Sequence, residues 1–205
     1  MSEMKRVGIY IFENMTMIDG YAPLQFFALA PGIEVFTFAK TPEPLMCDAG
    51  VLLTPQYGFD DCPEIDVLVV PGGGNVLKQM QDPDVIAFLK KAGEKADYVT
   101  SVCTGSLILA EAGLLDGRKA TSNKMAWSFV TSQDGDVLWQ PSARWVEDGK
   151  YVTSSGISAG IDMALALIED LEGREKAENV AKVAEYIWND DPADDPFAVE
   201  VAETN

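Results

Sequence analysis

The sequence predicts an α/β protein built as a three-layer α-β-α sandwich, in which a doubly wound and mainly parallel sheet has helices on both faces. Segments of strand and helix character alternate along the chain and are joined by short loops. The clearest strand segments are continuous apolar runs, which is typical of strands covered on both faces. Because no linker or internal repeat interrupts this pattern, we expect a single domain over residues 1–188.

The first third of the chain predicts a strand-helix unit, a second strand and a hairpin. Val7–Phe12 is continuously apolar, and Asp19–Ala30 has apolar residues at helical spacing. Gly32–Phe38 is the next strand. After a proline-containing turn, Leu45–Cys47 and Gly50–Thr54 are short enough to pair as a hairpin.

The middle of the chain predicts two buried strands, each followed by a helix. Asp66–Val70 ends abruptly at Pro71-Gly72-Gly73-Gly74. Asp82 precedes a proline and begins a helix that runs to about residue 96. Tyr98–Val102 is the next strand, and it leads directly into a helix over Thr104–Ala112.

The last third predicts a hairpin and a helical ending. Asp148-Gly149 is a strong turn signal between strands at Arg144–Glu147 and Tyr151–Thr153. The expected helices here are Asn123–Thr131, Ser158–Leu171 and Arg174 to about Trp188. Residues 189–205 are acidic and contain no basic residue, so we expect a tail in which Pro196-Phe197 packs while the remainder frays.

The composition restricts the classes of function. With 15 basic and 33 acidic residues the net charge is −18, which repels phosphate backbones and anionic membranes. We therefore expect no binding to nucleic acid or membranes, and the lack of an export signal predicts a cytoplasmic location. The chain has no histidine, which removes the commonest general base and metal ligand. We expect no metal and no cofactor, and chemistry that uses carboxylates, thiols, amides and hydroxyls.

Cys103 lies where the strand Tyr98–Val102 meets the following helix. So tight a turn holds its residue in a strained conformation, and the small residues Ser101 and Gly105 relieve the crowding. The helix N-terminus directs amide hydrogens at the sulfur, which favours the thiolate, and the amide of Thr104 can hold an oxyanion. The alternative is a buried core cysteine. We favour a reactive residue, because chemistry in open α/β sheets occurs at the carboxyl ends of strands.

Two further features follow strand ends and are expected at the same edge of the sheet. The loop at residues 71–74 allows the amide of Gly73 to join that of Thr104 in an oxyanion hole, although it can also be a flexible turn. Asp19 follows the first strand. It can cap the next helix, or it can act as acid and base toward Cys103, and its spacing supports both equally.

Taken together, these motifs resemble the ThiJ/PfpI superfamily, which has the flavodoxin-like fold of class I glutamine amidotransferases. The resemblance covers most of the chain. It rests on Met17-Ile18-Asp19-Gly20, Val69-Val70-Pro71-Gly72-Gly73, Ser101-Val102-Cys103-Thr104-Gly105-Ser106, residues 113–121 and residues 155–162.

Within the superfamily, the sequence is most similar to isocyanide (isonitrile) hydratases, which have aspartate at the position of Asp19 and Cys-Thr-Gly-Ser at the elbow. The resemblance implies that Cys103 attacks the terminal carbon of an isonitrile and that Asp19 is the acid and base. It also implies that the amides of Gly73 and Thr104 anchor the thioimidate, from which water releases an N-substituted formamide. Ile157 matches a position near the active site.

Asn123 stands where many members of the superfamily have histidine. The Cys-His dyad of its peptidases and glyoxalases, and the Cys-His-Glu triad of amidotransferases, therefore cannot be assembled in this chain. Asn123 can still orient a substrate by hydrogen bonds. Trp127 can form a wall of the pocket, or it can be an ordinary core residue.

Three functions remain open from the sequence. The first is hydration of an isonitrile or a related small electrophile at Cys103. The second is a redox or electrophile sensor with an oxidisable cysteine and no turnover. The third is a small-molecule-sensing module that acts through a partner, since similar domains are fused to AraC-type regulators. We expect a homodimer, because homodimers are common among the proteins that this chain resembles.

Overall fold

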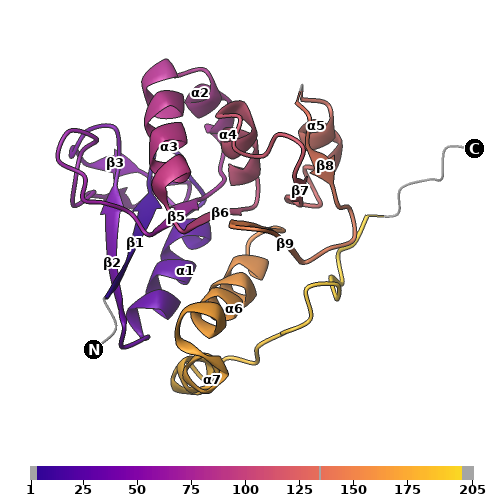
Figure 1. Cartoon of the computed structure of the whole chain (residues 1–205). Coiled ribbons are helices and arrows are strands. Elements are labelled where there is room, and N and C mark those ends of the chain that lie inside the picture. The colour runs from indigo at the N-terminus through magenta and orange to yellow at the C-terminus, as the bar shows by residue number, and fades with distance from the viewer. Residues whose placement is uncertain (1–3, 134, 200–205) are drawn as a thin grey trace, which may run out of the picture.

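A computed structural model of the chain describes residues 4–133 and 135–199 (Figure 1). The strands of its main sheet are β1 (Lys5–Tyr10), β2 (Ile33–Phe38), β5 (Val67–Val70), β6 (Tyr98–Val102), β9 (Trp145–Asp148) and β10 (Tyr151–Ser154). They lie in the order β2-β1-β5-β6-β10-β9. Every neighbouring pair is parallel except β10 and β9, which are antiparallel at one edge. The predicted α/β fold with a mainly parallel sheet is confirmed.

Helices cover both faces of this sheet. They are α1 (Met17–Ala28), α2 (Val76–Met80), α3 (Pro83–Lys95), α4 (Gly105–Glu111), α5 (Trp127–Thr131), α6 (Ala159–Glu172) and α7 (Arg174–Val183). Figure 1 shows α1, α6 and α7 on one side and α2, α3 and α4 on the other, which gives the three predicted layers. In residues 4–133 and 135–199, no helix combines the length and the apolar character needed to cross a membrane.

Several local signals in the sequence form the elements that they predict. All residues of β5 are buried, as its continuous apolar run requires. The side chain of Asp82 accepts hydrogen bonds from the amides of Asp84 (3.1 Å) and Val85 (3.4 Å), and so begins α3. The predicted short hairpin is formed by β3 (Leu45–Met46) and β4 (Leu52–Leu53).

Other elements differ from the prediction for local reasons. The helix expected from Asn123 begins only at Trp127, because the Asn123 side-chain oxygen accepts a hydrogen bond from the amide of Ala126 (3.0 Å) and forms a turn. α7 ends at Val183, since Glu185 adopts the left-handed conformation (φ 50°). Two short paired strands, β7 (Lys119–Ala120) and β8 (Leu138–Trp139), have two residues each and leave no pattern in the sequence.

The C-terminal segment, residues 189–199, is mostly exposed, and its one buried residue is Asp195 rather than the expected Pro196-Phe197. Asp195 is 8% exposed, whereas Phe197 is 69% exposed, so the polar residue packs and the aromatic one does not. The amide of Arg144 donates to the carbonyl of Pro192 (2.8 Å). Asp195 is buried because it pairs with buried cations. Residues 200–205 lie outside the described residues.

The strand order brings together the ends of the chain segments that carry the predicted site. The chain passes from β1 to β2 on one side and then crosses to β5 on the other side of β1. A switch in strand order of this kind opens a crevice at the carboxyl ends of the strands. Asp19 follows β1, the loop at residues 71–74 follows β5, and Cys103 follows β6.

Candidate active site

Cys103 occupies the turn between β6 and α4 in a left-handed conformation (φ 58°), which is uncommon for a residue with a side chain. Its amide donates to the carbonyls of Ser154 (3.2 Å) and Ser155 (3.1 Å). Its carbonyl accepts from the hydroxyls of Ser106 (3.2 Å) and Ser122 (2.9 Å). The predicted sharp elbow is present, and these hydrogen bonds offset its strain. Sequence reasoning did not single out either hydroxyl, although Ser106 belongs to the Cys-Thr-Gly-Ser motif.

The elbow packs closely against the end of β5. A Cβ atom added to Gly105 would collide with the carbonyl oxygen of Val70 and lie 2.7 Å from that of Pro71. Ser101, on the other side of the elbow, is fully buried. Only glycine fits at position 105 without a shift of the backbone, which agrees with the predicted crowding of the elbow.

Asp19 lies in the first turn of α1 and is fully buried. Its Oδ2 accepts a hydrogen bond from the amide of Gly72 (3.2 Å), and its Oδ1 has no hydrogen-bond partner within the described residues. The amide of Met17, at the start of α1, donates instead to Asp48 Oδ1 (3.0 Å). Of the two interpretations of Asp19, helix capping is therefore contradicted, and the carboxyl is free for another role.

Burial dominates the protonation of both Asp19 and Cys103. It raises the pKa of Asp19 from 3.8 to about 7, although hydrogen bonds from Gly72 and Cys103 oppose the increase. Burial and the adjacent Asp19 charge raise the pKa of Cys103 from 9.0 to about 12, against the lowering effect of the Thr104 amide and the Asn123 side chain. Desolvation and the Asp19 charge therefore oppose the predicted thiolate, and in the pKa of Cys103 they outweigh the helix N-terminus.

The loop at residues 71–74 approaches the elbow and hydrogen-bonds it through Gly73. The amide of Gly73 donates to Thr104 Oγ1 (3.2 Å), because an isolated bridge to Met15 fixes the direction of this loop. The Thr104 amide hydrogen-bonds the sulfur. A Cβ atom on Gly72 would lie 2.7 Å from the Thr104 nitrogen, so the loop touches the elbow directly. In this structure the Gly73 amide contacts the Thr104 hydroxyl, and its place in an oxyanion hole stays a prediction.

Asn123 reaches the sulfur from the side of β10. Its Oδ1 accepts from Ala126, its Nδ2 lies against the backbone of Gly156, and its side chain hydrogen-bonds Cys103. The structure thus places the Asn123 side chain against the Cys103 sulfur, and its role in orienting a substrate stays a prediction.

Trp127 and Ile157 lie on segments next to the site. Trp127 is 8% exposed and packs edge-on against Trp139, with ring centroids 6.3 Å apart. This packing favours the core interpretation of Trp127. Ile157 is 41% exposed and follows Gly156, which touches Asn123, so its position near the opening stays a prediction.

The other two cysteines differ from Cys103 in their surroundings. Cys47 is 3% exposed in the core. Cys62 borders a hollow of about 510 Å³ between the segment that precedes β5 and the helix α3, whereas Cys103 follows the opposite ends of the strands. Burial raises the pKa of Cys62 to about 11.

The parallel sheet and the cysteine at its strand-to-helix elbow define a flavodoxin-like α/β protein with a cysteine-centred site. The chain belongs to the DJ-1/PfpI family, whose model matches residues 5–170. The resemblance seen in the sequence is thus confirmed.

Relatives of this chain differ in function. An isonitrile hydratase of Pseudomonas putida is 37% identical over 181 residues, which cover 88% of this chain and 78% of that protein. A THiJ/PfpI family protein from Pseudomonas syringae has a similar structure, with a TM-score of 0.81, 34% identity, and coverage of 91% of this chain and 76% of that one. The HTH-type transcriptional regulator GbdR of Pseudomonas aeruginosa is 29% identical over 188 residues, which are 88% of this chain and 50% of the regulator. Family membership alone therefore does not define an activity.

Proposed function

We propose that the protein hydrates an isonitrile to an N-substituted formamide through a covalent intermediate on Cys103. One observation carries the proposal: in a chain without histidine, the Cys103 thiol lies beside the Asp19 carboxyl, whose pKa is about 7. The similarity to the isonitrile hydratase of Pseudomonas putida supports the substrate class.

The first half-reaction adds sulfur and hydrogen to the same carbon of R–N≡C. The sulfur forms the new C–S bond, and the carbon gains a hydrogen, which gives the thioimidate R–N=CH–S on Cys103. Because burial keeps the thiol protonated, its proton must leave as the bond forms. Asp19 can accept that proton, and in its acid form it can give one to the carbon.

The second half-reaction uses one water molecule. Its oxygen bonds to the thioimidate carbon, one of its protons passes to the nitrogen and the other returns to the sulfur, and the C–S bond breaks. The products are R–NH–CHO and the Cys103 thiol. The Thr104 amide and the Asn123 side chain lower the pKa of the sulfur, so they stabilise it as the leaving group.

A carboxyl with a pKa near 7 suits both proton transfers. At neutral pH the acid and carboxylate forms of Asp19 are both populated, which is the condition for a group that donates in one step and accepts in another. Burial gives the Asp19 carboxyl a pKa close to that of an unperturbed histidine.

The test is turnover of a small alkyl isonitrile, measured as formamide by NMR. The wild-type protein should form formamide, Cys103→Ala should lose at least about 10³-fold in rate, and Cys62→Ala should equal wild type. Asp19→Asn should be slow, and mass spectrometry should find the isonitrile mass added to Cys103. If wild type makes no formamide, or Cys103→Ala is as fast, the proposal fails.

The alternative of an oxidisable sensor requires an exposed thiolate at neutral pH. Cys103 is 7% exposed, and its pKa is raised to about 12. Both observations favour catalysis by a thiol that loses its proton only during the reaction. Selective oxidation of Cys103 by mild peroxide, in protein that turns over no isonitrile, would reverse this preference.

A further inference from the structure

The C-terminal segment, residues 189–199, connects α7 to the part of the fold that carries α5, β7 and β8. In Figure 1 it runs from α7, past α6, to the side of the molecule where α5, β7 and β8 lie. Arg144 and Val199 tie it down through backbone hydrogen bonds, from Arg144 to the Pro192 carbonyl (2.8 Å) and from Val199 to the Pro141 carbonyl (3.1 Å). The segment is therefore held to the domain at Pro192 and at Val199.

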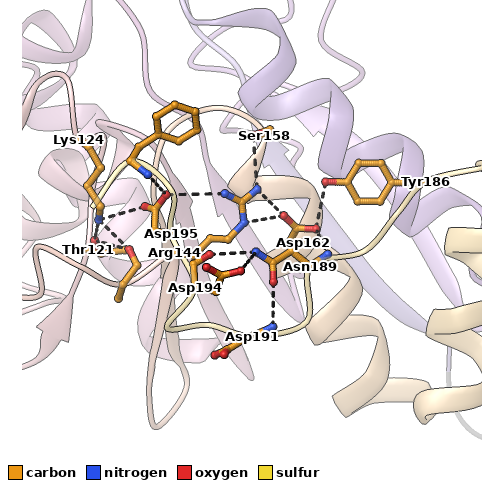
Figure 2. A network of polar contacts seen from close by, with 12 residues as sticks. Thr121, Lys124, Arg144, Ser158, Asp162, Tyr186, Asn189, Asp191, Asp194 and Asp195 are labelled. Carbon is orange, nitrogen blue, oxygen red and sulfur yellow. Dashed lines mark hydrogen bonds and ion pairs between the residues drawn. The ribbon is translucent and has the colours of Figure 1, made fainter. Parts of the chain in front are cut away.

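Figure 2 shows the buried charges that hold it. They alternate in sign, in the order Lys124, Asp195, Arg144 and Asp162, and their side chains are 8% exposed or less. Arg144 Nε donates to Asp162 Oδ2 (2.8 Å), Arg144 Nη1 lies 3.9 Å from Asp195 Oδ1, and Lys124 Nζ lies 3.8 Å from Asp195 Oδ2. Removing one charge leaves its neighbour buried and uncompensated.

Asp195 is the counter-charge of Lys124. The other acceptors of the Lys124 ammonium are neutral, namely the hydroxyl of Thr121 and the carbonyl of Ala143 (2.7 Å). Burial lowers the pKa of Lys124 to about 8, and Asp195 opposes this decrease. The carboxylate of the C-terminal segment thus keeps a buried ammonium charged and in place.

Lys124 follows Asn123 in the sequence, and the Asn123 side chain hydrogen-bonds the Cys103 sulfur. Its ammonium joins Thr121 to Ala143, and so fixes the backbone on either side of Asn123. Asn123 then has its Oδ1 on the Ala126 amide and its side chain on the sulfur of Cys103. A displaced Lys124 would move Asn123.

We propose that the C-terminal segment is a clamp for the active site, in which Asp195 acts as a positioning residue that sets Asn123 against the Cys103 sulfur through Lys124. This inference rests on the proposed role of Cys103 as the nucleophile. In this role Asp195 acts through Lys124 and Asn123 and does not contact the substrate.

The experiment measures the rate at which iodoacetamide alkylates Cys103 at pH 8, followed by mass spectrometry of the Cys103 peptide. Asp195→Asn should slow alkylation several-fold, because a sulfur without its Asn123 hydrogen bond forms less thiolate. Asp194→Asn removes the same charge from the adjacent exposed position and should alkylate at the wild-type rate. Asn123→Ala should be slowed as much as Asp195→Asn.

A double variant separates positioning from a general structural effect. If Asp195 acts through Asn123, Asn123→Ala/Asp195→Asn is no slower than Asn123→Ala alone. The proposal is overturned if Asp195→Asn lowers the melting temperature but alkylates at the wild-type rate, or if the two substitutions slow alkylation independently. Should Asp195→Asn not fold, Lys124→Met/Asp195→Leu removes both charges at similar volume, and a wild-type alkylation rate in that variant overturns the proposal.

Alkylation needs no isonitrile, so this test is separate from that of the proposed function. If the wild-type protein forms no formamide but the variants show the expected alkylation rates, the proposed isonitrile hydration is contradicted and the proposed role of Asp195 is supported. If the wild-type protein forms formamide but Asp195→Asn alkylates at the wild-type rate, the hydration is supported and the role of Asp195 is contradicted.

Discussion

Replacing Asp19 by asparagine should make the protein more stable at neutral pH while it removes the proposed acid and base. In the unfolded chain the carboxyl titrates near 3.8, and in the folded protein burial raises its pKa to about 7. Because the folded pKa is the higher one, the wild type loses stability as the pH increases from about 4 through about 7. At about 1.4 kcal/mol for each pKa unit, this loss reaches about 4 kcal/mol. Asp19→Asn avoids it and should be more stable by up to that amount above pH 7.

Urea unfolding of both proteins between pH 4 and 8 tests this prediction. The other carboxyls titrate in both proteins, so the difference in the free energy of unfolding isolates Asp19. Asp60→Asn, at an exposed position, is the control and should differ little from wild type at any pH. A difference between wild type and Asp19→Asn that stays constant from pH 4 to 8 would refute the buried carboxyl with a raised pKa.

Three further predictions follow from the packing and charges. Gly105→Ala should destabilise the protein by about 1–3 kcal/mol in thermal unfolding, because the new Cβ meets the Val70 carbonyl; an unchanged melting temperature contradicts the close packing. Arg144→Met should cost about 3–5 kcal/mol by leaving Asp162 buried and unpaired, and adding Asp162→Leu should recover most of it; a double variant as unstable as the single one contradicts the pairing. The alkylation rate of Cys103 should keep increasing above pH 9, since its pKa is raised to about 12, and a plateau near pH 7 would contradict this.

Most of the fold was predictable because its signals are local. The run Val67–Val70 is apolar at every position, and a strand buried on both faces needs that pattern. Asp82 and the following proline begin α3 through local interactions that do not depend on the rest of the fold. The two-residue strands β7 and β8 could not be predicted, because pairing between residues far apart in the sequence alone defines them.

In the C-terminal segment, the charge pattern of the sequence does not predict which side chain is buried, because the charged partners come from distant segments. Six acidic residues without a basic one predict a solvated tail. Asp195 is nevertheless buried, since Lys124 and Arg144 approach it from other segments. A sequence pattern does not state which charges will be paired, and pairing decides whether a charge can be buried.

The sequence by itself determined that Cys103 stands on a strand-to-helix elbow and that no histidine can activate it. Those facts depend on residue order and composition alone. Only the tertiary structure decided the protonation of the site. A helix N-terminus predicts a thiolate, but the pKa of Cys103 depends on desolvation and on the Asp19 carboxyl, and both arise from packing β1, β5 and β6 side by side. That packing buries the carboxyl and the thiol together, and it raises the pKa of both groups.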